Sequence, residues 1–86
     1  MPKRSKDQIT AQILEICLQS DIVKTKIVYQ VNMNFYTINP YLDRLIEMGL
    51  LEASLGTYTI YKTTPKGKYI LKMLRDIEEI IPECLL

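Results

Sequence analysis

Residues 24–51, KTKIVYQVNMNFYTINPYLDRLIEMGLL, contain the pattern that decides the fold. In the second half of this stretch, apolar residues recur at intervals of three or four, which is the spacing of one helix face. These residues are Phe35, Ile38, Leu42, Leu45 and Ile46. Gly49 follows them, and glycine commonly ends helices in a left-handed conformation. We therefore predict a helix over residues 35–48 with one buried face.

The other face of this predicted helix is polar. It carries Tyr36, Thr37, Pro40, Arg44 and Glu47, with Asn39 at its edge. A shorter apolar helix precedes it, and residues 32–34 form the corner between the two. Two helices at a tight corner, with hydrogen-bonding side chains outside the second, are typical of a helix-turn-helix that reads DNA. An ordinary amphipathic helix with a solvated outer face is the alternative.

Pro40 lies inside the predicted helix, where a proline removes one backbone hydrogen bond and costs about 3 kcal/mol. With Asn39 as its cap, the helix could instead begin at Pro40. We favour the longer helix, because the apolar spacing passes through Phe35 and Ile38 without a change of phase. Pro40 then projects outward, where a slight bend is tolerated.

Length and composition limit the possible functions. The chain has 86 residues, 48% of them hydrophobic, and a net charge of +1. This length supports one domain, residues 1–86, and the high apolar content favours an oligomer. The charge is uneven, with a basic N-terminus, a basic run from Lys62 to Arg75 and an acidic C-terminus.

Catalytic and metal-binding signals are missing from the sequence. It has no histidine, no Gly-rich phosphate loop and no recognisable carboxylate pair, so we expect neither an enzyme nor a cofactor. Its two cysteines, Cys17 and Cys84, are too distant in sequence to suggest a zinc site. Without a secretory signal or a transmembrane run, we expect a cytoplasmic protein with reduced thiols. A disulfide between two copies of Cys84 is the alternative to a free thiol there.

The first predicted helix, residues 5–20, is apolar on two sides. Ile9, Ile13, Ile16 and Cys17 form one face, whereas Leu14 and Leu18 lie nearly opposite. We expect one face to cover the core and the other to contact a partner chain. Residues 21–23 follow as a turn or a short edge strand.

After Gly49 the chain reads as a hairpin, with strands at residues 50–53 and 57–62, and then a helix over 65–81. Gly67, early in this helix, indicates a close packing contact. Apolar residues keep a seven-residue spacing along the helix, which favours a chain-to-chain contact. The predicted dimer interface is Leu14, Leu18, Ile70, Met73, Leu74, Ile77, Ile80 and Ile81. The alternative is that the stripe covers the domain's own core.

The element order is that of a winged helix-turn-helix, mainly α with a small β-hairpin and an extended C-terminal helix. The segments TKIVYQVNMNF, YLDRLIEMGLL and YKTTPKGKYIL also resemble a family of small archaeal winged-helix proteins that are predicted transcriptional regulators. The resemblance spans roughly residues 9–81. It implies DNA binding, with residues 35–48 as the recognition helix and 54–57 as the wing tip. Some members of that family dimerise through an antiparallel coiled coil of their C-terminal helices.

We therefore expect double-stranded DNA as the partner of a homodimer. The base-facing candidates are Tyr36, Thr37, Asn39 and Arg44. The phosphate-contacting candidates are Lys3, Arg4, Lys6, Lys24, Lys26, Lys62 and Lys66. The expected recognition helix has one cation beside two acids, and the wing tip has none. This scarcity keeps open a second hypothesis, a protein-interaction module that does not bind DNA.

Overall fold

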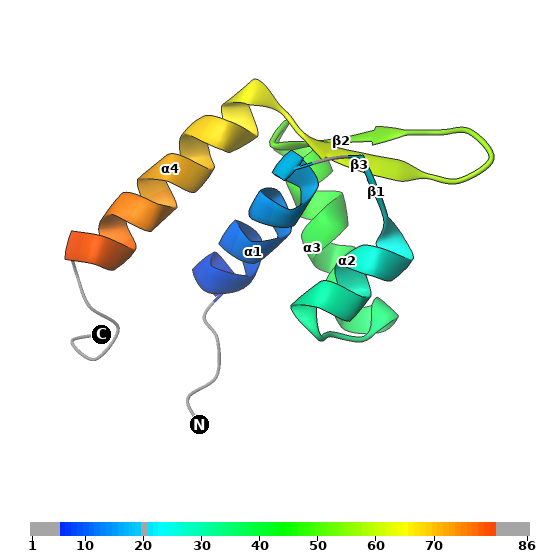
Figure 1. Ribbon diagram of the computed structural model, residues 1–86, viewed down its shortest axis with the longest axis horizontal. Coiled ribbons are helices and arrows are strands. Elements are labelled where there is room, and N and C mark those ends of the chain that lie inside the picture. The colour runs from blue at the N-terminus through cyan, green and yellow to red at the C-terminus, as the bar shows by residue number, and fades with distance from the viewer. Residues whose placement is uncertain (1–5, 20, 81–86) are drawn as a thin grey trace.

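Helices and strands follow one another in the order expected for a winged helix-turn-helix (Figure 1). The computed structural model describes residues 6–19 and 21–80, with side chains as far as Ile77. Its elements are α1 (Lys6–Gln19), β1 (Ile22–Val23), α2 (Lys24–Val31), α3 (Phe35–Glu47), β2 (Leu51–Ser54), β3 (Ile60–Thr63) and α4 (Pro65–Ile80). The predicted fold class is confirmed, including the long last helix.

The sheet is antiparallel, with strand order β1-β3-β2. Ile22 pairs with Tyr61, so residues 22–23 form a short edge strand. The sequence was compatible with either a turn or an edge strand here. The β2–β3 hairpin extends away from the helices as the wing (Figure 1). Its loop covers residues 55–59, so the tip lies slightly later than the predicted 54–57.

Helix α1 lies at the centre of the core, in contact with α2, β3 and α4. Ile9, Ile13, Leu14 and Cys17 are all buried on it. The placement of Leu14 corrects one prediction. Its side chain is fully enclosed by the protein's own elements, so it cannot face a partner chain as we expected. The hydroxyl of Thr63, on β3, donates to the Leu14 carbonyl oxygen at 2.6 Å and ties the sheet to this helix.

Helix α3 starts at Phe35, because the Asn34 side chain accepts a hydrogen bond from the Thr37 amide at 2.8 Å and caps it. The helix continues through Pro40, so the longer of the two predicted helices is correct. Ile38, Leu42 and Leu45 are buried as predicted, whereas Phe35 and Ile46 are exposed. These two residues lie at the edges of the apolar stripe, and the core covers only its middle.

The end of α3 and the start of α4 are joined by backbone contacts. Gly49 has a φ of 77°, and the Leu50 amide donates to the Leu45 carbonyl oxygen at 2.9 Å, which is a Schellman ending. The Thr64 amide then donates to the Leu50 carbonyl oxygen at 3.1 Å. A Cβ atom added at Gly67 would lie 2.2 Å from that same oxygen. The close contact predicted at Gly67 is therefore confirmed, and it fixes where α4 leaves the core.

Helix α4 begins with the Thr64 hydroxyl accepting from the Gly67 amide at 3.0 Å, which is an N-cap. Its buried side is narrow: Leu71 is buried, and Ile70 and Leu74 are half-buried against the core. Within residues 6–19 and 21–80, no helix has the length and apolarity that a bilayer span would require.

Candidate nucleic-acid interface

Helices α2 and α3 form the helix-turn-helix corner that the sequence predicted. Asn32 ends α2 with a φ of 60°, a left-handed conformation that asparagine tolerates better than most residues. Asn34 caps α3 two residues later. The corner is thus only three residues long, and its two asparagines determine the direction in which α3 leaves it.

The outer face of α3 presents three of the four predicted base-facing residues. Tyr36 is 89% exposed, and Thr37 and Arg44 are also exposed. Pro40 lies between them on the surface and cannot donate a backbone hydrogen bond to the Tyr36 carbonyl oxygen. The helix therefore offers aromatic, hydroxyl and guanidinium groups on a rigid support.

The fourth predicted residue, Asn39, is already engaged. Its side-chain oxygen accepts a hydrogen bond from the Lys24 ammonium at 2.5 Å, and both residues are partly buried. This contact joins the start of α2 to the middle of α3. It pairs Lys24, which we predicted to contact phosphate, with Asn39, which we predicted to face the bases. The two residues are 15 apart in sequence, so this hydrogen bond could not be predicted from the sequence.

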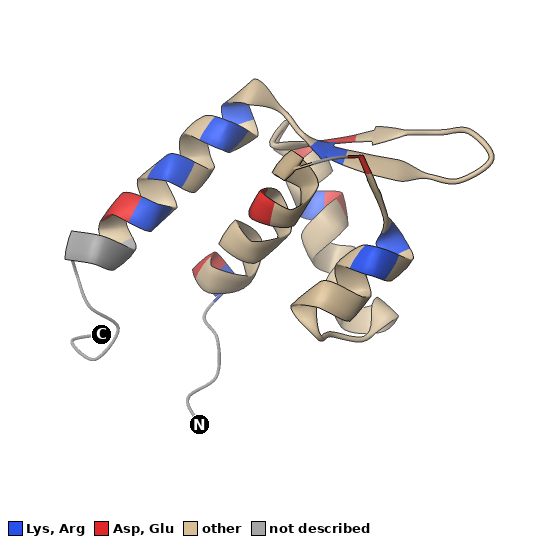
Figure 2. Ribbon diagram, in the orientation of Figure 1, with Lys and Arg blue, Asp and Glu red and all other residues tan. Residues whose placement is uncertain are grey.

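The remaining predicted cations lie on several elements (Figure 2). Lys26 is exposed on the first turn of α2, near Lys24. Lys62 is exposed on β3 opposite Glu52, whose charge offsets its own. Lys66 is exposed and donates to the Met48 carbonyl oxygen at the end of α3, at 3.1 Å. Lys6 is exposed at the start of α1, whereas Lys3 and Arg4 lie outside the described residues.

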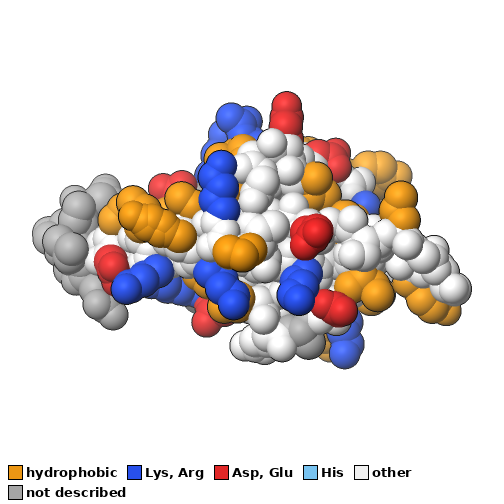
Figure 3. All heavy atoms as spheres, turned by 90° about the horizontal axis from the view of Figure 1, so that it is seen from above, with side chains coloured by type: hydrophobic (Ala, Val, Ile, Leu, Met, Phe, Trp, Pro, Cys, Tyr) orange, Lys and Arg blue, Asp and Glu red, His pale blue; other side chains and the backbone are white. Residues whose placement is uncertain are grey.

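The wing carries exposed apolar residues that the sequence analysis did not select. Leu55 is 88% exposed and Tyr58 is 71% exposed, both in the loop between β2 and β3. Seen from above, the end of the molecule that holds the wing shows hydrophobic side chains, while basic side chains stand along α4 (Figure 3). The absence of cations from residues 54–59 was visible in the sequence. The exposure of Leu55 and Tyr58 follows from the length of the hairpin beyond the core.

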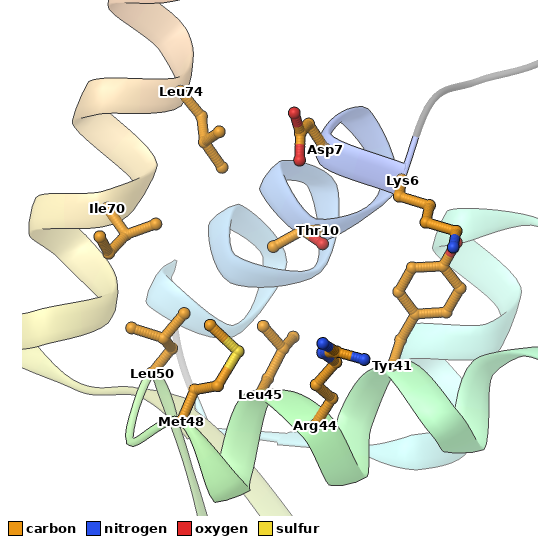
Figure 4. A pocket seen from close by; sticks show the side chains of 10 residues that line it. All are labelled: Lys6, Asp7, Thr10, Tyr41, Arg44, Leu45, Met48, Leu50, Ile70 and Leu74. Atoms are coloured by element: carbon orange, nitrogen blue, oxygen red, sulfur yellow. The ribbon is translucent and has the colours of Figure 1, made fainter.

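Arg44 borders two depressions of the surface. One is shallow and is lined by Pro40, Asp43, Glu47 and Met48 as well. The other is a deeper pocket between α1, α3 and α4, which Lys6 also lines (Figure 4). Lys6 and Arg44 are therefore brought to one pocket, which Lys24 and Asn39 do not line. No pocket could be predicted from the sequence, because three helices that are distant in sequence build it.

The predicted dimer residues divide into three groups. Leu14 is buried, and Ile70 and Leu74 are partly covered by the protein's own core. Leu18, Met73 and Ile77 are exposed. Ile81 and the side chain of Ile80 lie outside the described part of the structure. Tyr69, which the sequence analysis missed, is exposed one turn before Met73 and extends the same stripe.

Among the described residues, no group of three or more His, Cys, Asp or Glu side chains could hold a metal ion. Cys17 is buried in the core, and burial raises the pKa of its thiol to about 12. Because the thiolate is the reactive form, Cys17 is a packing residue rather than a nucleophile in the folded protein. Cys84 lies outside the described residues.

Two proteins of Methanocaldococcus jannaschii, both uncharacterized, are similar in sequence. One is 30% identical over 79 residues, which is 92% of this chain and 36% of that protein. The other is 28% identical over 79 residues and is covered to 78%. This chain thus spans about a third of the first relative.

Three solved structures have a similar fold. Sso10a-2, described as a DNA-binding protein from Sulfolobus solfataricus, gives a TM-score of 0.83 at 27% identity, covering 90% of this chain and 81% of that one. ZitR from Lactococcus lactis gives 0.72 at 19% identity, with coverages of 93% and 60%. The transcriptional repressor CouR, bound to a 23-mer DNA duplex, gives 0.71 at 17% identity, with coverages of 90% and 56%. At these identities the last two establish the fold alone.

The model of one protein family matches almost the whole chain, from residue 3 to residue 82. The matched segment includes the α2–α3 corner, the wing and α4. The chain belongs to this family, the winged helix-turn-helix proteins.

Proposed function

We propose that this protein binds double-stranded DNA as a homodimer and acts as a transcriptional regulator or a small chromosomal protein. The observation that carries the proposal is the outer face of α3, where Tyr36, Thr37 and Arg44 are exposed on a helix whose other face is buried. Helices held in this way enter the major groove with their first turns near the base edges. Family membership and the likeness to a DNA-binding protein support the same reading.

Each candidate on α3 suits a different contact. The Arg44 guanidinium fits the O6 and N7 atoms of guanine, and Thr37 can reach a phosphate or the methyl group of thymine. Tyr36 has a ring and a hydroxyl at the leading end of the helix. The Asn39 carbonyl oxygen is occupied by Lys24, so its NH2 group is the part available to an acceptor. We therefore place Asn39 at the edge of the contact surface.

Phosphate contacts supply much of the affinity of a DNA-binding protein and make it salt-dependent. Lys26 and Lys24, at the start of α2, are best placed to flank α3. An ammonium has three N–H donors, so Lys66 keeps two for a phosphate after bonding Met48. Lys3, Arg4, Lys6 and Lys62 are further candidates. A dimer would double the set, which matters for a chain with a net charge of +1.

For the dimer, we propose the exposed stripe of α4. Tyr69, Met73 and Ile77 are spaced by four residues, so they lie on one helix face, and each is exposed. Leu18 of α1 is an additional exposed apolar residue. Ile70 and Leu74 border the stripe, and Ile80 and Ile81 continue its spacing. Leu14 is excluded from this interface by its burial.

The test is the anisotropy of a fluorescent DNA duplex titrated with protein at several salt concentrations. Affinity should fall steeply with salt, and Lys26→Ala should weaken binding to all sequences and reduce the salt slope by about 1 per subunit. On a selected site, Arg44→Ala should cost about 1–3 kcal/mol and relax the sequence preference. Lys72→Ala removes an exposed cation of α4 and is the control. Identical behaviour of all three variants would refute the proposed surface.

A protein-interaction module is the second candidate. The exposed Leu55 and Tyr58 at the wing tip favour it. A wing that contacts DNA phosphates is expected to carry cations, and these two side chains have no charge. Asp43 and Glu47 also flank Arg44 and weaken the attraction of α3 for phosphate. Undetectable binding of the unmodified protein to any duplex at low salt would favour this candidate over DNA binding.

A further inference from the structure

The pocket between α1, α3 and α4 has a volume of about 350 Å³, within the range of small-molecule sites (Figure 4). Its walls come from three helices and from the residues between α3 and β2. The Schellman ending of α3 and the contact at Gly67 hold these walls in place. Backbone contacts thus join the end of α3 to the start of α4, on two sides of the pocket.

The two ends of the pocket differ in chemistry. Ile70 and Leu74 of α4 lie at one end, with Leu50 and Met48 beside them (Figure 4). Each is an aliphatic or thioether side chain with no charge to satisfy. A ligand portion placed there would leave water for an apolar surface, which is favourable by about 25 cal/mol per Å².

At the other end, Arg44 and Lys6 approach the pocket from α3 and α1, and the Lys6 ammonium lies next to the Tyr41 hydroxyl in the view of Figure 4. Both cations are exposed, and neither forms an ion pair with another described residue. Asp7 also lines the pocket from α1 and lies toward Leu74 in Figure 4, so the lining holds two cations and one carboxylate. A single excess positive charge suits one anionic group and opposes a second.

From this division we propose that the pocket binds an amphipathic organic monoanion, a small carboxylic acid with an aliphatic body. The carboxylate pairs with Arg44 and Lys6, and the body lies against Ile70, Leu74 and Leu50. Charge complementarity at one end and apolar lining at the other select this occupant over a neutral molecule or a free phosphate.

Binding at this site has a consequence that rests on the proposed function. Arg44 is both a pocket residue and a candidate base contact, so a carboxylate that pairs with it competes with DNA. The acid would then act as an effector that weakens DNA binding. By linkage, DNA would weaken binding of the acid by the same factor.

The first experiment tests the pocket without DNA. Butanoate, hexanoate and octanoate, each below its micelle concentration, are titrated into 15N-labelled protein, and amide shifts are followed by NMR. We expect shifts centred on Leu45, Met48 and Leu50, with affinity rising roughly tenfold for every two CH2 groups. Octan-1-ol, which keeps the body and lacks the charge, should bind at least tenfold more weakly than octanoate. Equal affinities for the acid and the alcohol, or shifts centred elsewhere, would overturn the proposal.

Two matched variants isolate the charge. Arg44→Gln removes a pocket cation at an exposed position, so the fold is expected to persist, and octanoate affinity should fall about tenfold with little change for octanol. Lys72→Gln removes an exposed α4 cation that does not line the pocket and should leave both affinities unchanged. An equal loss in the two variants would mean non-specific attraction and would reject the site. If octanoate bound only after dilution to monomers, a second copy of the chain would be the occupant of the pocket in the dimer. This result would also reject the proposed ligand.

The second experiment measures duplex binding with and without saturating octanoate. We expect a severalfold loss of affinity for the unmodified protein and none for Arg44→Gln. Octanoate binding with unchanged DNA affinity would overturn the effector role. A protein that binds octanoate at this site but never binds DNA would support the pocket and refute the proposed function, so the two failures are distinguishable.

Discussion

Helices α1 and α4 are both rich in apolar residues, but the fold uses them differently. Helix α1 is enclosed by α2, β3 and α4, and the second apolar side marked by Leu14 is an interior surface. Within the described part of the chain, α4 has neighbours on one side only, and Tyr69, Met73 and Ile77 are exposed. An additional apolar face thus indicates an additional neighbour, and the neighbour can belong to the same chain.

The largest expected effect comes from truncating the enclosed side of α1. Leu14→Ala should lower the free energy of unfolding by about 3–5 kcal/mol, because it leaves a cavity among immobile neighbours. Leu18→Ala, one turn later and 37% exposed, is the matched control and should cost about 1 kcal/mol or less. Urea unfolding of both variants gives the comparison. Similar losses would mean that this side of α1 is covered as well at Leu18 as at Leu14.

The next effect concerns the place where α4 leaves the core. Gly67→Ala puts a methyl group against the Leu50 carbonyl oxygen, at a position where backbone must move. Despite the better helix propensity of alanine, we expect a net loss of about 1–3 kcal/mol in thermal or urea unfolding. Gly56→Ala, in the wing loop, meets only ordinary contacts and is the control. A stabilising Gly67→Ala would show that α4 can shift without cost.

The exposed side of α4 should affect association rather than folding. Ile77 is 48% exposed, so Ile77→Asp should change monomer stability by about 0.5 kcal/mol or less. If the proposed dimer forms, the same change should weaken association at least tenfold, because a charge replaces an apolar contact. Light scattering over a dilution series measures it, with the exposed Tyr29→Asp of α2 as control. Unchanged mass for Ile77→Asp would place any interface elsewhere.

Much of the fold was predictable because its signals are local. The stripe at Ile38, Leu42 and Leu45 and the stop at Gly49 each depend on neighbours within one or two turns. Pro40 was assigned correctly because its outward direction follows from the same periodicity. Periodicity shows which face of a helix is the most apolar. It therefore predicts the helix itself more reliably than it predicts which element packs against each face.

The parts of the candidate site that escaped prediction depend on contacts between distant segments. The Lys24–Asn39 hydrogen bond, the enclosure of Leu14 and the pocket beside Arg44 each need two or three elements to be placed in space. The exposure of Leu55 and Tyr58 depends on how far the hairpin extends beyond the core. Phe35 was assigned to the core from spacing alone, and the fold leaves it at the rim.

The smallest expected effect comes from the ion pair between Glu15 of α1 and Arg75 of α4, which joins the two helices beyond the buried part of their contact. Both side chains are about half exposed, so water screens the pair, and Arg75 makes a further interaction of its own. A double-mutant cycle with Glu15→Gln and Arg75→Gln should give a coupling of about 0.2–1 kcal/mol that decreases with added salt. A much larger coupling would mean that charge holds α4 to α1. The contrast between the helices would then depend on this bridge as well as on burial, and Leu71 and Leu74 would contribute less to the contact than their positions indicate.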